Sequence, residues 1–177
     1  MKLITLATLA LTALCISPSS QDAKLTFSKA SLDFGIVVSD IEASAKFYSE
    51  VLGFREAQGF SVGADFCRDA GLTDGKPLDI RVFVLGEGAD GTKVKLMQVE
   101  GVKPKESDNA FVESQFGMSY MTIFVSDMTQ SLAVLKKAGV ATLAKSPVPI
   151  GEGEAAPQLT LVRDPDGNLI ELIGPLL

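Results

Sequence analysis

The chain has 177 residues, of which 46% are hydrophobic and 21% are charged. This composition is typical of a folded globular protein and excludes a largely disordered chain. The net charge of −6 argues against nucleic acid and anionic membrane surfaces as partners, because both attract basic proteins. There is no histidine, which excludes Ser-His-Asp catalysis, Cys-His catalysis and any histidine-ligated metal site within this chain.

Residues 1–23 are predicted to be a signal peptide. Lys2 precedes an apolar run from Leu3 to Ile16, and these 14 residues fall short of the roughly 20 that span a bilayer. We therefore expect a secreted or periplasmic protein with no membrane attachment once the segment is removed. Two alternatives are an N-terminal membrane anchor and a lipoprotein modified at Cys15, although Leu14 stands where a small residue is usual.

Cys67 is the only cysteine beyond this region. An exported domain with one thiol forms no internal disulfide, so its hydrophobic core must provide its stability. Because there is no histidine to activate the thiol, we interpret Cys67 as structural and not as a nucleophile.

The next elements form an internal repeat. Phe34–Phe54 and Met121–Val140 each contain a β-branched apolar run, then Val-Ser-Asp, then a helical pattern. The aspartates, Asp40 and Asp127, are suited to cap the helix N-terminus. Further strands are predicted after each helix, at Phe54–Val62, Leu78–Gly86 and Thr92–Val99 in the first half and at Val140–Pro147, Pro157–Asp164 and Asn168–Ile173 in the second.

The predicted unit is therefore β-α-β-β-β, and it occurs twice in one domain of residues 30–175. The first module covers about residues 32–100 and the second about residues 119–175, with Val99–Met118 as the connection. The longest insert is Ala64–Pro77 in the first module. Such a loop either carries binding residues or is a surface excursion.

Val37–Phe54 (VVSDIEASAKFYSEVLGF) and Val162–Ile173 (VRDPDGNLIELI) resemble the paired signatures of the vicinal oxygen chelate (VOC) superfamily, which includes glyoxalase I, bleomycin resistance proteins and extradiol dioxygenases. The resemblance covers about Leu32 to Ile173. It implies an α+β fold in which two βαβββ modules pair into a cup-shaped mixed β-sheet. In enzymatic members the cup holds a divalent metal, with ligands from the first and last strand of each module.

The residues at these four family positions are Asp33, Lys95, Tyr120 and Glu171. Lysine argues against a metal, because an ammonium group has no lone pair to coordinate a cation. Asp33 and Glu171 could still hold a hard divalent ion. The better match of charges is an ion pair of Lys95 with Glu171, because a carboxylate alone in an apolar wall is costly. That pair could serve a ligand or be a purely structural remnant.

The turn before Glu171 is predicted to set its direction. Pro165 and Gly167 suit a tight turn between the last two strands. Along the last strand, Glu171 shares a face with Leu169 and Ile173, and the alternate residues lie on the other face. One face is expected to line the cup and the other to pack on helices.

We therefore predict a glyoxalase-like protein that binds a small oxygen-bearing or aromatic ligand in a metal-free cup, with Asp33, Lys95, Tyr120 and Glu171 as the ligand pocket. No cofactor is expected. The alternative is a divalent-metal-dependent lyase, isomerase or dioxygenase that uses Glu171 and Asp33. The resemblance also allows a homodimer in which two chains complete the cup. Candidate wall residues, each of which could instead pack in the core, are Phe34, Tyr48, Phe54, Phe60 and Phe83.

Overall fold

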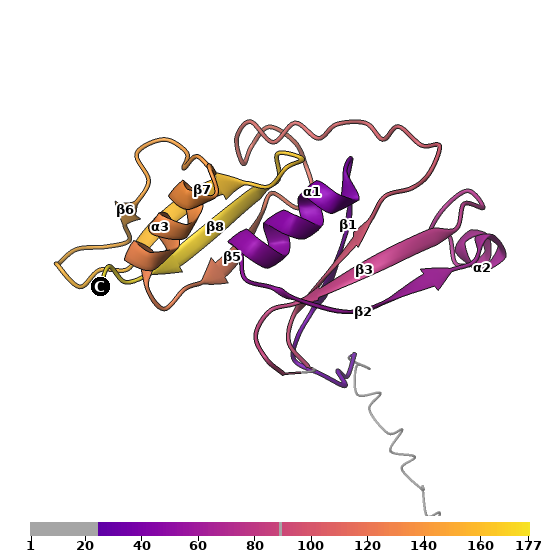
Figure 1. Cartoon of the computed structure of the whole chain (residues 1–177), viewed down its shortest axis with the longest axis horizontal. Coiled ribbons are helices and arrows are strands. Elements are labelled where there is room, and N and C mark those ends of the chain that lie inside the picture. Colours follow the sequence, from indigo (N-terminus) through magenta and orange to yellow (C-terminus); the bar gives the residue numbers. More distant parts are fainter. Residues whose placement is uncertain (1–24, 89) are drawn as a thin grey trace, which may run out of the picture. The chain divides into compact units, whose positions relative to one another are not determined.

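The computed structural model of the protein describes residues 25–88 and 90–177. The predicted signal peptide lies outside these ranges. In chain order the elements are β1 (Asp33–Val37), α1 (Ile41–Lys46), η1 (Phe47–Val51), β2 (Arg55–Val62), α2 (Ala64–Asp69), β3 (Leu78–Val84), β4 (Lys93–Met97), β5 (Tyr120–Phe124), α3 (Met128–Lys137), β6 (Val148–Pro149), β7 (Gln158–Arg163) and β8 (Leu169–Gly174) (Figure 1). No helix within the described ranges is long and apolar enough to cross a membrane.

The strands form two four-stranded sheets with the same topology. The first has the order β1-β4-β3-β2 and the second β5-β8-β7-β6. In each sheet the first strand runs parallel to the last strand of its module, and the other neighbours are antiparallel. Apart from the inserted α2, each half is therefore β-α-β-β-β, and the repeat predicted from the sequence is confirmed.

Both module helices begin where the sequence predicts. The side chain of Asp40 accepts hydrogen bonds from the backbone N–H groups of Glu42 and Ala43, each at 3.0 Å. Asp127 accepts one from Gln130 at 3.1 Å. These bonds satisfy N–H groups that have no partner inside the helix. The first helix then continues as the π-helical segment η1, which the sequence pattern did not indicate.

The strand predicted at Val140–Pro147 is wrong. The structure places only the two-residue β6 in this part of the second sheet, after a turn in which Ala144 has a φ of 50°. Pro147 and Pro149 have no backbone N–H to donate to a neighbouring strand, so this segment cannot sustain a longer ladder. It is instead tied to β7 by a hydrogen bond from Leu143 N to Leu161 O at 2.8 Å.

One hydrophobic core joins the two modules. It includes Tyr48, Phe83 and Leu96 from the first module and Met128, Val162 and Leu172 from the second. Because side chains alternate across a strand, Lys95 lies on the opposite face from Leu96, and Glu171 on the opposite face from Leu172. We call these the far faces of the two sheets, since they are turned away from the core that contains α1 and α3.

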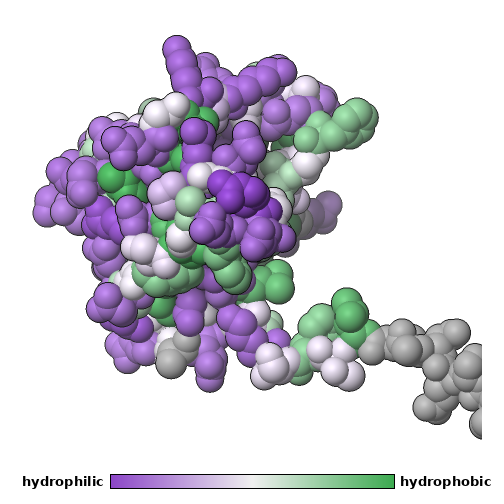
Figure 2. Space-filling view, turned by 90° about the vertical axis from the view of Figure 1, so that its right-hand side faces the viewer, coloured by the Kyte–Doolittle hydropathy of each residue, from purple (hydrophilic) through white to green (hydrophobic). Residues whose placement is uncertain are grey.

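The long insert covers part of the far face of the first sheet. It contains α2, whose Cys67 is fully buried against Leu78, Ile80 and Val82 of β3. The thiol donates to Val62 O at 3.7 Å, which agrees with a structural role for this cysteine. Cys67 therefore anchors the insert to the sheet, while most other residues of the insert are exposed at the surface. On the side of the molecule that Figure 2 shows, hydrophobic residues form small groups between hydrophilic ones.

Candidate functional site

The far face of the first sheet carries the first two predicted site residues. Lys95 of β4 lies opposite Gly35 of β1 in the parallel register, and Asp33 is two residues earlier on the same face. Lys95 Nζ contacts Asp33 Oδ2 at 2.9 Å, with the side chains 30% and 24% exposed. Lys95 Nζ also lies 5.9 Å from the centre of the Phe60 ring, within range of a cation–π interaction. The site therefore combines an ammonium group, its carboxylate and a half-exposed aromatic ring.

The far face of the second sheet carries Glu171. Thr122 of β5 is its neighbour in the parallel register, and Thr122 Oγ1 donates to Glu171 Oε1 at 2.7 Å. Thr122 was not among the predicted site residues, although its position two residues after Tyr120 places both on one face of β5. The hydroxyl gives Glu171 a hydrogen-bond donor within its own sheet.

The predicted ion pair of Lys95 with Glu171 is wrong for the single chain. Among the described residues, the ion pair of Lys95 is with Asp33, and none joins it to Glu171. The physical reason is topological, because β4 and β8 belong to different sheets, whereas Asp33 is on the strand next to Lys95. Lys95 therefore pairs with Asp33 in the first sheet, and Glu171 accepts a hydrogen bond from Thr122 in the second.

The four positions do not fit a divalent metal. Lys95 offers no lone pair while it is an ammonium group, and it engages Asp33, one of the two carboxylates that could bind a cation. Within the described ranges, no three His, Cys, Asp or Glu side chains are grouped so as to hold a metal ion. The donor set lacks the several oxygen ligands that a hard cation needs.

Tyr120 is the predicted site residue that lines a cavity. The cavity has a volume of about 330 Å³ and lies between β1, β5 and the connection of the two modules. Phe34 and the buried Tyr48 also line it, whereas Phe54 and Phe83 are core residues and Phe60 is 47% exposed. Asp33, Lys95 and Glu171 do not line this cavity. The structure therefore distributes the four predicted residues over three places.

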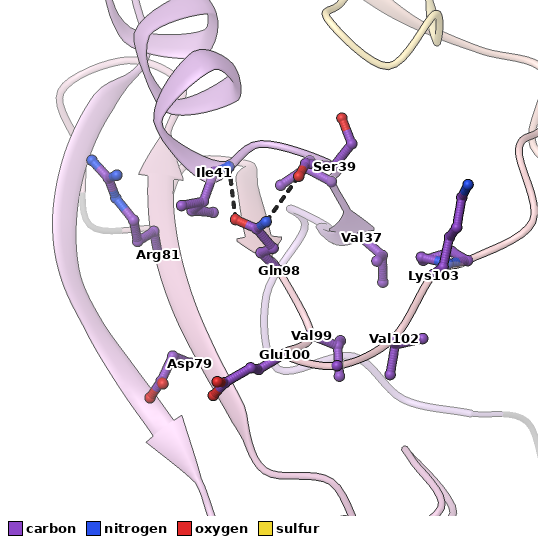
Figure 3. Close-up of a pocket in the computed structure, with 13 residues that line it drawn as sticks. Val37, Ser39, Ile41, Asp79, Arg81, Gln98, Val99, Glu100, Val102 and Lys103 are labelled. Carbon is purple, nitrogen blue, oxygen red and sulfur yellow. Dashed lines mark hydrogen bonds between the residues drawn. The ribbon is translucent and has the colours of Figure 1, made fainter.

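A second, larger pocket of about 660 Å³ lies at the N-terminus of α1 (Figure 3). Gln98, immediately after β4, is fixed there by two hydrogen bonds, one from Gln98 Nε2 to Ser39 O at 2.8 Å and one from Ile41 N to Gln98 Oε1 at 3.2 Å. Gln98 was not among the residues predicted from the sequence. Because its amide is engaged by backbone groups, Gln98 positions the start of α1 on the first sheet.

Arg81 of β3 is on the wall of this pocket and is also engaged by protein groups. It donates to Glu56 at 2.7 and 3.0 Å and to Glu42 at 3.0 Å. The hydrogen bonds with Glu56 are the main reason that the pKa of Arg81 is raised above its ordinary value, and they lower the pKa of Glu56. The guanidinium therefore links α1, β2 and β3.

The turn between β7 and β8 contacts the first module. Asp164 Oδ2 accepts a hydrogen bond from Tyr48 OH at 3.1 Å, and Asp166 accepts bonds from Ser39 N at 3.0 Å and Ser44 Oγ at 3.4 Å. We call these five residues the inter-module joint. Burial, followed by the nearby charge of Asp164, raises the pKa of Tyr48 far above its ordinary value. The turn thus does more than set strand register.

Several solved structures share this fold. A glyoxalase family protein from Bacillus cereus aligns with a TM-score of 0.68 and 18% identity over 88% of this chain and 99% of that one. A trypanothione-dependent glyoxalase I from Leishmania major gives 0.53 and 24% over 83% and 87%. A mutant glyoxalase I from Zea mays gives 0.58 and 20% over 82% of this chain and 47% of that one. At these identities the likeness concerns the fold alone.

No sequence match was found among curated proteins. Residues 31–172 match the family model described as the Glyoxalase/Bleomycin resistance protein/Dioxygenase superfamily. This match covers most of the chain and both modules, in agreement with the α+β architecture of two four-stranded sheets. The chain therefore belongs to the Glyoxalase/Bleomycin resistance protein/Dioxygenase superfamily.

Proposed function

We propose that this protein binds a small oxygen-bearing or aromatic molecule on its far faces without a divalent metal. The observation that carries the proposal is the 2.9 Å contact between Lys95 Nζ and Asp33 Oδ2. It places a paired ammonium group where the family resemblance predicts metal ligands. An ammonium group has three N–H donors, so Lys95 can bind Asp33 and still donate to an oxygen atom of a ligand.

The surroundings of Lys95 favour a ligand with an aromatic or apolar part. Phe60 is 47% exposed and offers its ring beside the ammonium group. On the second sheet, Glu171 accepts a hydrogen bond from Thr122 and retains acceptor capacity for an O–H or N–H of the ligand. The first sheet thus supplies a donor with an aromatic wall, and the second supplies an acceptor.

We further propose that two copies of the chain complete the site. Lys95 and Glu171 are on different sheets, and large apolar side chains remain uncovered on the far faces. Phe124 is 78% exposed and Tyr120 is 47% exposed. Pairing the first sheet of one copy with the second sheet of the other would bury these side chains. It would also bring Lys95 of one copy towards Glu171 of the other, with the ligand between them.

The second candidate is a lyase, isomerase or dioxygenase that depends on a divalent metal held by Glu171 and Asp33. The shared fold with glyoxalase I structures supports it, and the donor set at these positions counts against it. Export by the N-terminal segment is part of both proposals, because the apolar run after Lys2 is typical of a signal peptide.

The two candidates differ in their need for metal. The purified protein is first analysed for bound metal. Its melting temperature is then measured with Mn²⁺, Ni²⁺, Zn²⁺ and Fe²⁺. The same measurement is repeated with catechol and acetophenone as oxygen-bearing aromatic probes. We expect no tightly held metal and stabilisation by a probe. A metal ion bound to each chain and lost on Glu171→Gln would contradict the metal-free proposal.

Matched variants locate the site. Lys95→Met and Glu171→Gln are expected to reduce the stabilisation by the probe. Lys136→Met changes an exposed lysine of α3, away from the far faces, and should leave it unchanged. Molar mass measured by light scattering tests the homodimer, and a monomer that binds the probe with full affinity would refute the shared site.

A further inference from the structure

The cavity between the two modules has the features of a separate ligand site. Its volume of about 330 Å³ falls within the roughly 300–1,000 Å³ range of small-molecule pockets. Hydrophobic side chains make up much of its wall. They include Phe34 and Ile36 of β1, Met118 before β5, Met121 of β5, and Leu169 and Ile170 of β8.

The backbone of β1 offers hydrogen-bonding groups to this cavity. The N–H of Val38 donates to Met97 O of β4 at 3.0 Å, so even-numbered residues of β1 direct their peptide groups towards β4. Gly35 and Val37 therefore direct theirs away from β4, and both line the cavity. In the described part of the chain, β1 is at the edge of its sheet and pairs with β4 alone.

The backbone of β5, on the opposite wall, also offers hydrogen-bonding groups to the cavity. The N–H of Val125 donates to Ile173 O at 2.8 Å, so odd-numbered residues of β5 face β8. The peptide groups of Tyr120 point the other way, and Tyr120 lines the cavity. Among the described strands, β5 pairs with β8 alone. Two open strand edges therefore border one cavity, and such edges bind amide groups of extended chains.

The connection between the modules adds a positive charge. Lys105 and Ser107 both line the cavity and are exposed. Neither side chain has a hydrogen bond or ion pair with any described residue. An ammonium group and a hydroxyl beside an apolar cavity suit a carboxylate on an otherwise apolar ligand.

We infer that the cavity between β1 and β5 binds an N-acylated amino acid with an apolar side chain. The amide of such a ligand pairs with the strand edges at Val37 and Tyr120. Its side chain packs against the apolar wall, and its carboxylate contacts Lys105. This site goes beyond the proposed function, because Lys95, Asp33 and Glu171 do not line the cavity.

Three related probes test each feature of the ligand. The full-length protein is titrated by calorimetry with N-acetyl-L-phenylalanine, with N-acetyl-L-phenylalaninamide, which lacks the carboxylate, and with 3-phenylpropanoate, which lacks the amide. The first is expected to bind at least about tenfold more tightly than either analogue, equivalent to about 1.4 kcal/mol. Equal affinity for 3-phenylpropanoate, or no binding of N-acetyl-L-phenylalanine, would overturn the proposal.

Two pairs of variants on the exposed connection locate the site. Lys105→Gln should weaken the acid about tenfold and leave the neutral amide unchanged within about twofold, whereas Lys103→Gln, outside this cavity, should affect neither. Ser107→Trp should block binding by filling the cavity from the connection. Glu113→Trp, on the same connection but not at the cavity, should not.

Backbone amide NMR spectra then show where the probe lies. The N–H signals of Val37 and Tyr120 are expected to shift on addition of N-acetyl-L-phenylalanine, in wild type and in Lys95→Met alike. Shifts confined to the residues around Lys95, or loss of binding in Lys95→Met, would assign the ligand to the far face and refute this second site. If the far face binds no ligand at all, the result here is unaffected.

Discussion

The hydroxyl of Tyr48 donates a hydrogen bond to Asp164 across the two modules, at 3.1 Å and with both residues buried. Asp164 also accepts bonds from Asp166 N at 3.0 Å and from Asn168 N and Nδ2 at 2.8 Å. Four donors thus surround one buried carboxylate, which is the condition under which such a charge is tolerated. Of these four donors, the hydroxyl of Tyr48 belongs to the first module, and the other three belong to the same turn as Asp164.

Tyr48→Phe removes this donor with little change in shape. We expect the free energy of unfolding to fall by about 1–3 kcal/mol, because a buried charged acceptor loses a partner. Urea denaturation measures the change. Tyr120→Phe is the matched control, since Tyr120 is 47% exposed and its hydroxyl has no partner among the described residues. Its effect should stay within about 0.5 kcal/mol, and equal losses in the two variants would contradict the role of the joint.

The same hydrogen bond predicts a dependence on alkaline pH. The folded state raises the pKa of Tyr48 above the value of about 10 in the unfolded chain. Below that pH the contribution of Tyr48 to stability is complete. Above it, the unfolded state releases a proton that the folded state retains, so stability falls by up to about 1.4 kcal/mol per pH unit.

Absorbance of the phenolate measures this effect. The chain has two tyrosines, so in Tyr120→Phe the signal comes from Tyr48 alone. Ionisation of Tyr48 should coincide with loss of secondary structure by circular dichroism. Reversible ionisation well before unfolding would show that Tyr48 is not held in the buried, bonded state.

Lys95→Glu tests why the far face does not fit a metal. The change replaces the ammonium group beside Asp33 with a second carboxylate, and two adjacent carboxylates repel each other unless a cation binds between them. We expect the variant to be less stable than wild type in chelator and to regain stability with Mn²⁺. Each kcal/mol regained should raise the melting temperature by about 2–4 °C.

Lys136→Glu is the control for this variant, because it makes the same change of charge at an exposed position of α3, away from Asp33. An equal effect of Mn²⁺ on wild type would contradict the view that Lys95 prevents cation binding. An equal effect on Lys136→Glu would show a general response to added negative charge.

The two helix caps are expected to differ in strength. Asp40 accepts two backbone N–H groups and Asp127 accepts one. Alanine at either position should cost about 0.5–2 kcal/mol, with the larger loss at Asp40. Asparagine, which also accepts these bonds, should cost much less at both. Urea denaturation of the four variants checks the order, and a larger loss for Asp127→Ala would refute it.

Much of the fold could be predicted because its signals are local. Asp40 and Asp127 stand before periodic apolar segments, and the alternation around Glu171 reports two faces of one strand. Two elements were not predicted correctly, the strand at Val140–Pro147 and the helix α2. Pro147 and Pro149 shorten the strand predicted before them, and α2 is short enough for a loop pattern to conceal it.

The site was less predictable because it depends on which strands become neighbours. The sequence indicated that Lys95 needs a carboxylate and that Glu171 needs a donor. It could not decide between Asp33 and Glu171 as the partner of Lys95, since both are acidic and both were expected in one cup. Because β4 and β8 belong to different sheets, Lys95 pairs with Asp33. Glu171 instead accepts a hydrogen bond from Thr122.

The inter-module joint also has a consequence for the order in which the chain folds. Tyr48 and Asp164 are separated by 116 positions, and Ser39 and Asp166 by 127. During synthesis, α1 therefore emerges long before the turn that holds it. The N-terminal half cannot complete its own packing until nearly the last residues have left the ribosome. Contacts between such distant positions slow folding, so a chain that stops short of the final hairpin would expose the apolar side of its first helix.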